Sequence, residues 1–319
     1  MRADSCKEEG KVSPQTIYVV ALLGFIGILP LLSQDPYLLH VMIVANILAM
    51  FALSWDFVAG FLGLINFGQA MFFGAGAYFI GFLVKAYSIP PIFGMIGGGL
   101  MALLLSLIVG IPCLRLRGPY YSIATLAFSQ VLFTLALGLT DLTGGEEGIR
   151  NIPKFIGQTV GHYYFSFLLL FIIIVSFKFL LRSPFGKQLI SIREDDRLSE
   201  AAGINTGLYK IFGTAIGAFI AGFAGAYSSY FHAQVNPDTL SIGLTFYVVA
   251  AVVFGGVGTL YGALIGAYAL TFLNEYLYFM MEYRLLIYPL AIMLILLFSP
   301  NGLFGLFRER IKVFGHGNP

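Results

Sequence analysis

The side chains that could carry out chemistry in this 319-residue chain are few and scattered. Its four histidines are His40, His162, His232 and His316. None of them has the i,i+4 spacing that would place two metal ligands on one face of a helix. Cys6 and Cys113 form neither a disulfide framework nor a paired thiol site, and no Gly-x-Ser-x-Gly elbow for a hydrolytic serine occurs. The sequence therefore predicts no metal, no cofactor and no hydrolytic activity.

A glycine-rich segment, GGVG at 255–258, has the composition of a nucleotide-binding loop. It lacks the lysine that such a loop needs, and no GxxxxGK[ST] motif occurs elsewhere in the chain. We therefore predict that the chain is not an enzyme and cannot hydrolyse ATP by itself. The better interpretation of 255–258 is a broken or tightly bent segment at membrane depth, whose freed backbone must line a cavity or pack on protein.

Polar residues inside strongly apolar segments are costly and often mark a transport pathway. Those in this chain are Asn46, Asn66, Gln69, Gln130, Asn274 and Glu275. Asn66 and Gln69 are three residues apart on one helical face, beside glycines, and uncharged amides there suit the passage of a zwitterion. We predict a translocation pathway that uses Asn46, Asn66, Gln69 and Gln130. The alternative for each amide is a hydrogen bond that merely holds two helices together.

Two carboxylates need separate interpretation. Glu275 has the position of an ion-coupling residue, but Arg284 follows in the next short turn, so a structural ion pair is the favoured prediction. Asp56 ends an apolar segment, where we expect it to be hydrated or to cap the helix.

The most charged part of the chain, 183–207, begins with a helix-start signature. Ser183-Pro184 has the pattern of an N-cap followed by proline at the first helical position. Ser191 and Glu194 match a capping box. Asp195 would then fall in a first helical turn, where the helix dipole favours negative charge.

A narrow apolar face follows the predicted capping box. Leu198, Ala201 and Ala202 recur at i, i+3 and i+4, and Gly203 is expected to end the helix. A helix of about 11 residues is too short to be stable alone in water. We therefore expect this helix to dock on another surface.

The elements that must position these residues are membrane helices. The chain is 58% hydrophobic and 11% charged, with a mean hydropathy of +0.87. A soluble domain carries about 25% charged residues, so too few charges are present to coat a globule in water. The fold class predicted is an all-α, polytopic helical membrane protein in one permease domain, 15–299, with terminal tails 1–14 and 300–319.

About ten transmembrane or partly spanning helices fit the apolar segments, since a bilayer core needs roughly 20 helical residues. The predicted spans are 15–33, 38–58, 66–86, 92–113, 119–139, 163–182, 208–231, 243–258, 260–281 and 284–299. The glycine-rich spans 66–86 and 243–258 are expected to be broken or to enter and leave by one face. The glycine pairs Gly94/Gly98, Gly213/Gly217 and Gly262/Gly266 predict faces of close helix packing.

The distribution of basic residues predicts the orientation. With the N-terminus cytoplasmic, the inner segments 1–14, 114–118, 183–207 and 300–319, with Arg182 and Lys210 at their edges, hold 13 of the 18 Lys and Arg. We therefore predict both termini and the coupling loop 183–207 inside, and the acidic loop 140–162 outside.

Several motifs, in order along the chain, resemble permeases of branched-chain amino-acid ABC transporters, and in particular their LivM type. They are DFVAGFLGLINFGQA at 56–70, FGAGAY at 73–78, LRLRGPY at 114–120, TLAF at 125–128, LTGG at 142–145, GGVGT at 255–259 and SPNGL at 299–303. Together they run from about residue 40 to 305. Urea and short-chain amide permeases look similar, so the resemblance is firmer for the family than for the substrate.

The short sequence Glu200-Ala201-Ala202-Gly203 resembles the coupling helix of ABC importer permeases, which inserts into a groove on the ATPase subunit. The wider pattern of those permeases has a spaced glycine and an Ile-x-Leu-Pro element, both missing here. The resemblance implies that Glu200, Ala201, Ala202 and Gly203 dock on the ATPase. Arg193, Asp195 and Asp196 would then contact it at the rim.

The resemblance also implies a setting in the cytoplasmic membrane of a bacterium or archaeon. The expected partners are a second, LivH-like permease, two ATP-binding subunits, an external amino-acid-binding protein and membrane lipid, with no nucleic acid. The binding protein would contact loop 140–162 and 236–238. The rival hypothesis from another class is an ion-coupled carrier of small polar solutes, with Glu275 as its ion ligand; a purely structural membrane subunit is a third.

Overall fold

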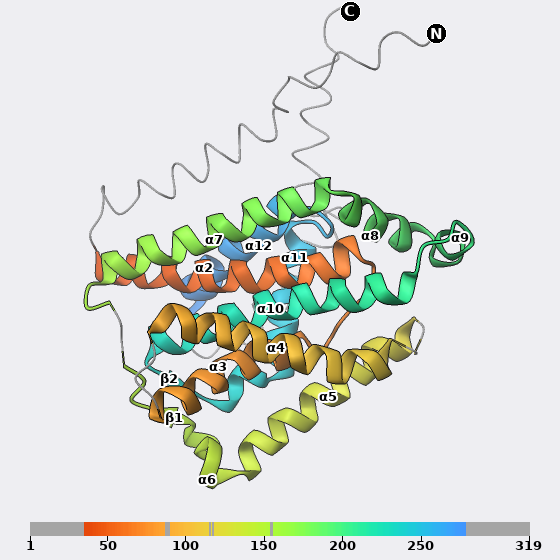
Figure 1. Ribbon diagram of the computed structural model, residues 1–319. Helices are drawn as coiled ribbons and strands as arrows, with labels where there is room; N and C mark the ends of the chain where they lie inside the picture. The colour runs from red at the N-terminus through yellow and green to blue at the C-terminus, as the bar shows by residue number, and fades with distance from the viewer. Residues whose placement is uncertain (1–34, 87–89, 115, 117, 154–155, 279–319) are drawn as a thin grey trace, which may run out of the picture.

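The computed structural model describes residues 35–86, 90–114, 116, 118–153 and 156–278. The elements in chain order are α2 (Pro36–Asp56), the π-helical turn η1 (Phe57–Phe61), α3 (Gln69–Ala86), α4 (Pro91–Cys113), α5 (Pro119–Gly138), α6 (Thr140–Thr143), η2 (Gly145–Glu147), β1 (Ile149–Arg150), α7 (Thr159–Arg182), α8 (Pro184–Glu194), α9 (Asp196–Ala201), α10 (Thr206–His232), β2 (Gln234–Val235), η3 (Pro237–Leu240), α11 (Ile242–Gly255) and α12 (Leu260–Tyr278). The described part of the chain is a helical bundle with one short pair of strands (Figure 1).

Helix starts follow local chemistry that the sequence makes visible. Proline occupies the first position of α2, α4, α5 and α8, where its missing N–H costs no hydrogen bond. Side-chain caps supply further starts: Asp35 accepts from the amide of Tyr37, and Ser241 accepts from that of Leu244 at 3.2 Å. Both devices satisfy or remove the amides that would otherwise lack a partner at a helix start.

Two helices, α2 and α10, form the centre of the bundle (Figure 1). α2 packs against α7 and α12, and α10 packs against α3 and α4. At the meeting of α3, α4 and α10, a Cβ on Gly98 would lie 3.0 Å from the carbonyl of Gly76 and 2.8 Å from the side chain of Ala226. The helices therefore meet backbone to backbone, as small residues permit in lipid.

The predicted glycine packing faces are confirmed. Beside Gly98, Gly213 lies against Leu62, Gly217 against Val58, and Gly266 against the α11 backbone. Helices α4, α5 and α7 leave much of their apolar surface exposed, as expected of a surface that meets lipid or a partner protein.

Within the described ranges, five helices are long and apolar enough to cross a membrane, or six if a bent pair counts as one span. Each of the eight predicted spans from 38–58 to 260–281 coincides with a helix, to within a few residues at either end. The predicted spans 15–33 and 284–299 lie outside the described residues. The total of about ten spans and the orientation of the termini therefore remain predictions.

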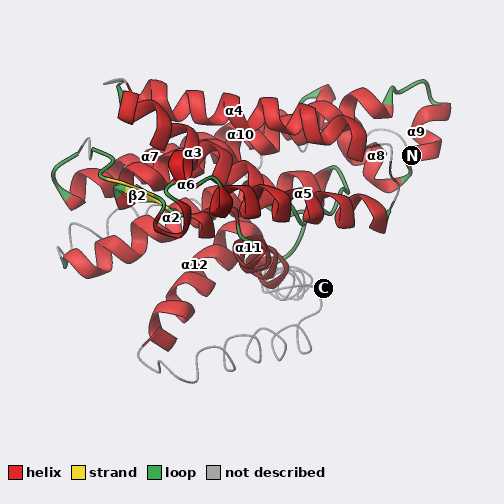
Figure 2. Ribbon diagram, turned by 90° about the horizontal axis from the view of Figure 1, so that it is seen from below, coloured by secondary structure: helices red, strands yellow, loops and turns green. Residues whose placement is uncertain are grey.

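The segment 255–258 is a sharp bend, as its sequence predicted. Helix α11 ends at Gly255, α12 begins at Leu260, and the two axes differ by 119°. Figure 2 shows α11 nearly end-on and α12 running away at an angle. Gly256 and Gly258 have φ of +117° and +74°, a backbone region that favours glycine.

The span predicted at 66–86 is also interrupted, since α3 begins only at Gln69, after the irregular segment 62–68. Both glycine-rich spans are therefore incomplete as single helices.

The two short strands lie near one end of the bundle, and α8 and α9 lie at the other (Figure 1). Ile149 pairs with Val235 and Arg150 with Gln234, in antiparallel register. The strand residues 149–150 of the loop 140–162 are thus neighbours of the segment before Asn236, although the paired residues are more than 80 positions apart along the chain. Helix α7, with 24 residues and a length of about 36 Å, connects the two ends.

Candidate functional site

The loop 183–207 contains two short helices, and the second begins at Asp196, later than the predicted capping box at Ser191 placed it. Ser183 caps α8 by accepting from the amide of Gly186, and Pro184 is its first residue, as expected. The capping box predicted at Ser191 and Glu194 is wrong, because both lie inside α8. Since the earlier cap starts a helix whose face buries Leu189 and Ile192, α8 continues through this point.

Asp195 supplies the cap of the second helix. Its backbone is extended, with φ −154° and ψ 108°, and its carboxylate accepts from the amide of Leu198 at 2.9 Å. Helix α9 then runs for six residues, and Gly203, with φ +87°, follows its end as predicted. The hydroxyls of Ser191 and Ser199, 3.0 Å apart, hold α8 and α9 together.

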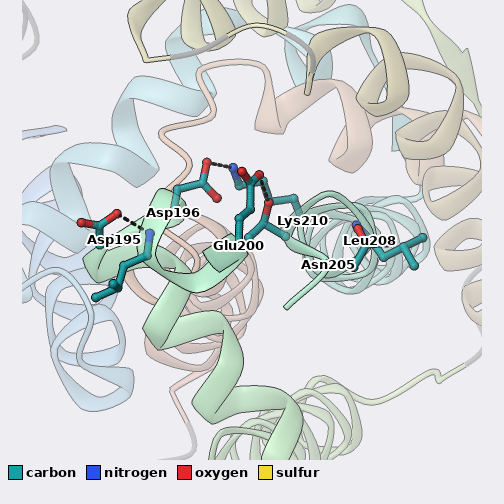
Figure 3. A network of polar contacts seen from close by, with 8 residues as sticks. Asp195, Asp196, Glu200, Asn205, Leu208 and Lys210 are labelled. Carbon is teal, nitrogen blue, oxygen red and sulfur yellow. Dashed lines mark hydrogen bonds and ion pairs between the residues drawn. The ribbon is translucent and has the colours of Figure 1, made fainter. Parts of the chain in front are cut away.

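Two polar contacts fix α9 to the start of α10 (Figure 3). The Lys210 ammonium lies 2.5 Å from a carboxylate oxygen of Asp196, and its side chain is only 17% exposed. The Thr206 hydroxyl donates to Glu200 at 2.8 Å. Asp196 and Glu200, predicted as docking residues, thus hold α9 at a set position on the membrane helix that follows.

The opposite face of α9 is apolar and exposed. Leu198 is 69% exposed, and Ala201, Ala202 and Gly203 are exposed as well, whereas Ser199 is buried against the bundle. Exposed apolar side chains are one feature of surfaces that bind other proteins. This is the face predicted to dock.

A cavity of about 670 Å³ lies beside this helix. Its wall comes from three separate parts of the chain: the segment after η1, the turn between α4 and α5, and the α8–α10 region. Lining residues include Leu62, Leu114, Ile192, Asp196, Glu200 and Lys210. The α8–α9 end of the bundle is therefore hollowed, with both charges and leucines in its wall.

Arg193, another of the predicted docking residues, contacts a different part of the bundle, the turn η1 at the end of α2. One guanidinium nitrogen donates to the carbonyl of Gly60 at 2.6 Å, and the other lies 2.6 Å from the Glu194 carboxylate. The sequence contains no signal for this contact, since 133 residues separate Arg193 from Gly60.

Asp56 is fully buried at the end of α2. Its carboxylate accepts from the amide of Gly258, in the bend between α11 and α12, at 2.7 Å. The expectation of a hydrated carboxylate is therefore wrong, and the side chain instead caps an amide of another segment. The GGVG motif pointed to a bend with freed backbone groups, but it did not identify which residue would satisfy them.

Three of the four predicted pathway amides are buried and hydrogen-bonded. The Asn66 side chain donates to that of Gln69 at 2.8 Å, and Gln69 donates to Ser54 at 3.2 Å. Asn46 donates to Ser166 at 2.8 Å and accepts from the hydroxyl of Tyr268. The bonds of Gln69 and Asn46 join helices, which is the alternative role considered for each amide. Asn66 lies in the irregular segment before α3, so the prediction that it shares a helical face with Gln69 is wrong.

Gln130 is the exception, because it is exposed on α5.

Glu275 accepts a hydrogen bond from the hydroxyl of Tyr37, at the start of α2. Arg284, the ion-pair partner predicted for Glu275, lies outside the described residues. Among the residues that the structure describes, no group of three His, Cys, Asp or Glu could hold a metal ion.

The geometry defines a class of protein: a multi-pass helical membrane protein with broken, glycine-lined spans and an exposed helix at one end. Residues 37–298 match the family described as "Branched-chain amino acid transport system / permease component", and the chain belongs to this family. No solved structure matches the chain significantly.

Several relatives of the chain are also named as branched-chain amino acid permeases. The chain is 27% identical to the high-affinity branched-chain amino acid transport system permease protein LivM of Escherichia coli K12, over 96% of this chain and 78% of the relative. It is 27% identical to a probable LivM of Methanocaldococcus jannaschii, over 67% of this chain and 74% of the relative. The LivH permease of E. coli K12 is 26% identical over 81% of this chain and 91% of its own length. The LivM-type resemblance of the motifs is thereby confirmed.

Proposed function

We propose that this chain is the LivM-type permease of an ABC importer, located in the cytoplasmic membrane of a bacterium or archaeon, and that it translocates branched-chain amino acids. Two ATP-binding subunits drive the cycle from the cytoplasmic side, and an external binding protein delivers the solute. The relatives named above support the substrate class, and a sequence without a P-loop supports ATP hydrolysis by partner subunits.

The observation that carries this proposal is the exposed apolar face of α9. Leu198, Ala201 and Ala202 lie exposed on a helix that the Asp196–Lys210 ion pair attaches to α10. A subunit that covers this face can therefore move α9 and α10 as one unit. Driven by ATP, this movement biases a two-state equilibrium between outward-open and inward-open arrangements.

We place the solute pathway beside α5, at the contact with a second, LivH-like permease. Gln130 is exposed there among apolar neighbours such as Val131, which is 54% exposed. An amide facing lipid is unfavourable, so a pairing surface explains its position better than a lipid-facing one. In this arrangement Asn46, Asn66 and Gln69 hold the helices that support the pathway.

The docking assignment predicts the behaviour of Ala201→Trp. The indole would block close approach of an ATPase subunit, while Ala201 makes no packing contribution inside the bundle because it is exposed. We expect normal amounts of the protein in the membrane, loss of co-purified ATPase subunits, and loss of binding-protein-stimulated ATP hydrolysis and leucine uptake. Lys187→Trp, on the exposed side of α8, is the control. Normal uptake by the Ala201 variant would contradict the docking assignment.

A further inference from the structure

Arg193 lies in the last turn of α8, and its side chain contacts the end of α2. Its guanidinium donates to the carbonyl of Gly60 at 2.6 Å. Its aliphatic stem lies against the backbone that follows η1, where a Cβ on Gly63 would come within 2.8 Å of Arg193 Cγ. The side chain thus holds the segment between α2 and α3 through both its polar group and its stem.

The partner carbonyl belongs to an irregular turn. Gly60 lies in the π-helical turn Phe57–Phe61, which closes α2 and in which the regular i→i−4 ladder is interrupted. Gly60 is buried, and a buried carbonyl without a partner costs free energy. A charged donor from α8 therefore stabilises this end of α2 more than a neutral donor would.

The same turn touches the bend between α11 and α12. A Cβ on Gly60 would lie 2.6 Å from the Cα of Gly258, and one on Gly258 would lie 3.2 Å from a guanidinium nitrogen of Arg193. Asp56, one turn before Gly60, accepts from the Gly258 amide at 2.7 Å. Arg193, Gly60, Gly258 and Asp56 therefore form a single contact, which we call the hinge junction. It joins α8, the end of α2 and the 119° bend.

We propose that Arg193 is a positioning residue of the transport cycle, which transmits movement of the α8–α9 loop through the hinge junction to the bend between α11 and α12. This inference rests on the proposed function, since the movement of the loop comes from the ATPase subunits. The ATPase subunits contact Leu198 and the alanines at α9 and displace the α8–α9 loop. Arg193 then transmits this displacement to the hinge junction.

The chemistry of the contact supports transmission rather than docking. The planar guanidinium uses one nitrogen on Gly60 and another on Glu194, a two-point contact that a lysine ammonium cannot reproduce. Gly256 and Gly258 have no side chains through which to contact α8, so the side chain of Arg193 makes this contact at Gly258. Loss of Arg193 would therefore leave the loop free to move without moving α11 and α12.

The test measures leucine uptake per ATP hydrolysed, in proteoliposomes that contain the complete transporter purified from native membrane and its binding protein. We expect Arg193→Ala to retain the ATPase subunits and to hydrolyse ATP, but to transport about tenfold less leucine per ATP, a typical size for a coupling effect. Arg193→Lys should recover part of the ratio, since it keeps one charged donor. The matched control is Lys187→Ala, an exposed cation on the same helix, which should keep the wild-type ratio.

A second variant tests the junction from its far side. Gly258→Ala places a methyl group against Gly60 and Arg193, and alanine is strained at φ +74°. The substitution alters no residue of loop 183–207. We expect the same loss of uptake per ATP with all subunits bound.

Two results would overturn the role of Arg193: an unchanged ratio in Arg193→Ala, or loss of the ATPase subunits from that variant, which would make Arg193 a docking residue. A wild-type chain that purifies without ATPase subunits would instead contradict the proposed function itself.

Discussion

Amide side chains inside membrane helices serve two purposes, and burial distinguishes them in this protein. Asn46 is fully buried, with its amide donating to Ser166 and its carbonyl accepting from Tyr268. These bonds connect α2 with α7 and α12, so the side chain holds three helices together. Gln130 is exposed on α5 and is free to meet a solute or a partner.

Asn46→Leu should therefore reduce stability without changing transport chemistry. Hydrogen bonds between membrane helices contribute about 1 kcal/mol each, and the substitution removes two of them while leaving the Tyr268 hydroxyl unpaired. We expect a lower midpoint of thermal unfolding in detergent, measured by thiol-reactive fluorescence on the buried Cys113, with an unchanged KM for leucine uptake.

Gln130→Leu is the matched comparison, because the same substitution is made at an exposed amide. It should leave the unfolding midpoint unchanged and alter the KM for uptake. If Asn46→Leu shifts the KM while the unfolding midpoint stays the same, Asn46 belongs to the pathway after all.

The polar residues of the sequence identified the relevant positions but not their roles. Side-chain amides look identical in a sequence whether they line a pathway or join helices, because the distinction depends on which helices surround them. Arg193 is a stronger example, since its charge predicted a surface contact and its observed partner lies 133 residues away.

At the scale of elements, glycine controls how closely the helices approach. A Cβ on Gly266 would press on the carbonyl of Ala251 and lie 3.0 Å from the amide nitrogen of Gly255. Helices α11 and α12 thus contact each other through backbone on the inner side of their bend. The sequence predicted this packing face from glycines four residues apart, without showing which helix they would meet.

Gly266→Ala should separate α11 from α12, because backbone atoms on α11 cannot rotate away from the added methyl group. Overpacking typically costs about 1–3 kcal/mol, so we expect a clearly lower unfolding midpoint and reduced uptake. The control is Gly110→Ala in α4, where the nearest atom is the Thr214 hydroxyl at 3.9 Å. That variant should be as stable as wild type or more stable by up to about 1 kcal/mol. Equal stability of the two variants would contradict the backbone contact.

Helix starts were predictable where one local signal acted alone, and wrong where two competed. Ser183 and Pro184 begin α8 as expected. The predicted capping box at Ser191 does not form, because Ser191 lies inside α8 and the buried face of that helix continues to Ile192. Tertiary packing therefore outweighs the local motif. Asp195 then became the cap of α9, a role that its residue type permits equally well.

At the scale of the whole molecule, apolar length predicted the spans and basic residues predicted their direction. The helices between residues 36 and 278 occupy the predicted segments because a bilayer leaves few alternatives to a helix of about 20 residues. Their packing order and the 119° bend depend on contacts between distant segments, such as Asp56 with Gly258. The sequence provides no local pattern for such contacts.

The charge distribution predicts the orientation of the bundle in the membrane, and labelling of single cysteines tests it. Lys187 on α8 and Leu142 on α6 are both exposed, at opposite ends of the bundle (Figure 1). In a background with Cys6→Ser and Cys113→Ser, we introduce Lys187→Cys or Leu142→Cys. A membrane-impermeant maleimide should label Leu142→Cys from the outside of spheroplasts and Lys187→Cys only in inverted vesicles.

The physical reason is the energetic preference for lysine and arginine on the cytoplasmic side of a membrane, which the basic segment around α8 satisfies in only one orientation. Labelling of Lys187→Cys from outside would place α9 beyond the reach of any cytoplasmic ATPase. An ATP-driven stroke through α9 would then be impossible, whatever the family of the chain. The orientation is therefore the condition on which the docking face and the hinge junction both depend.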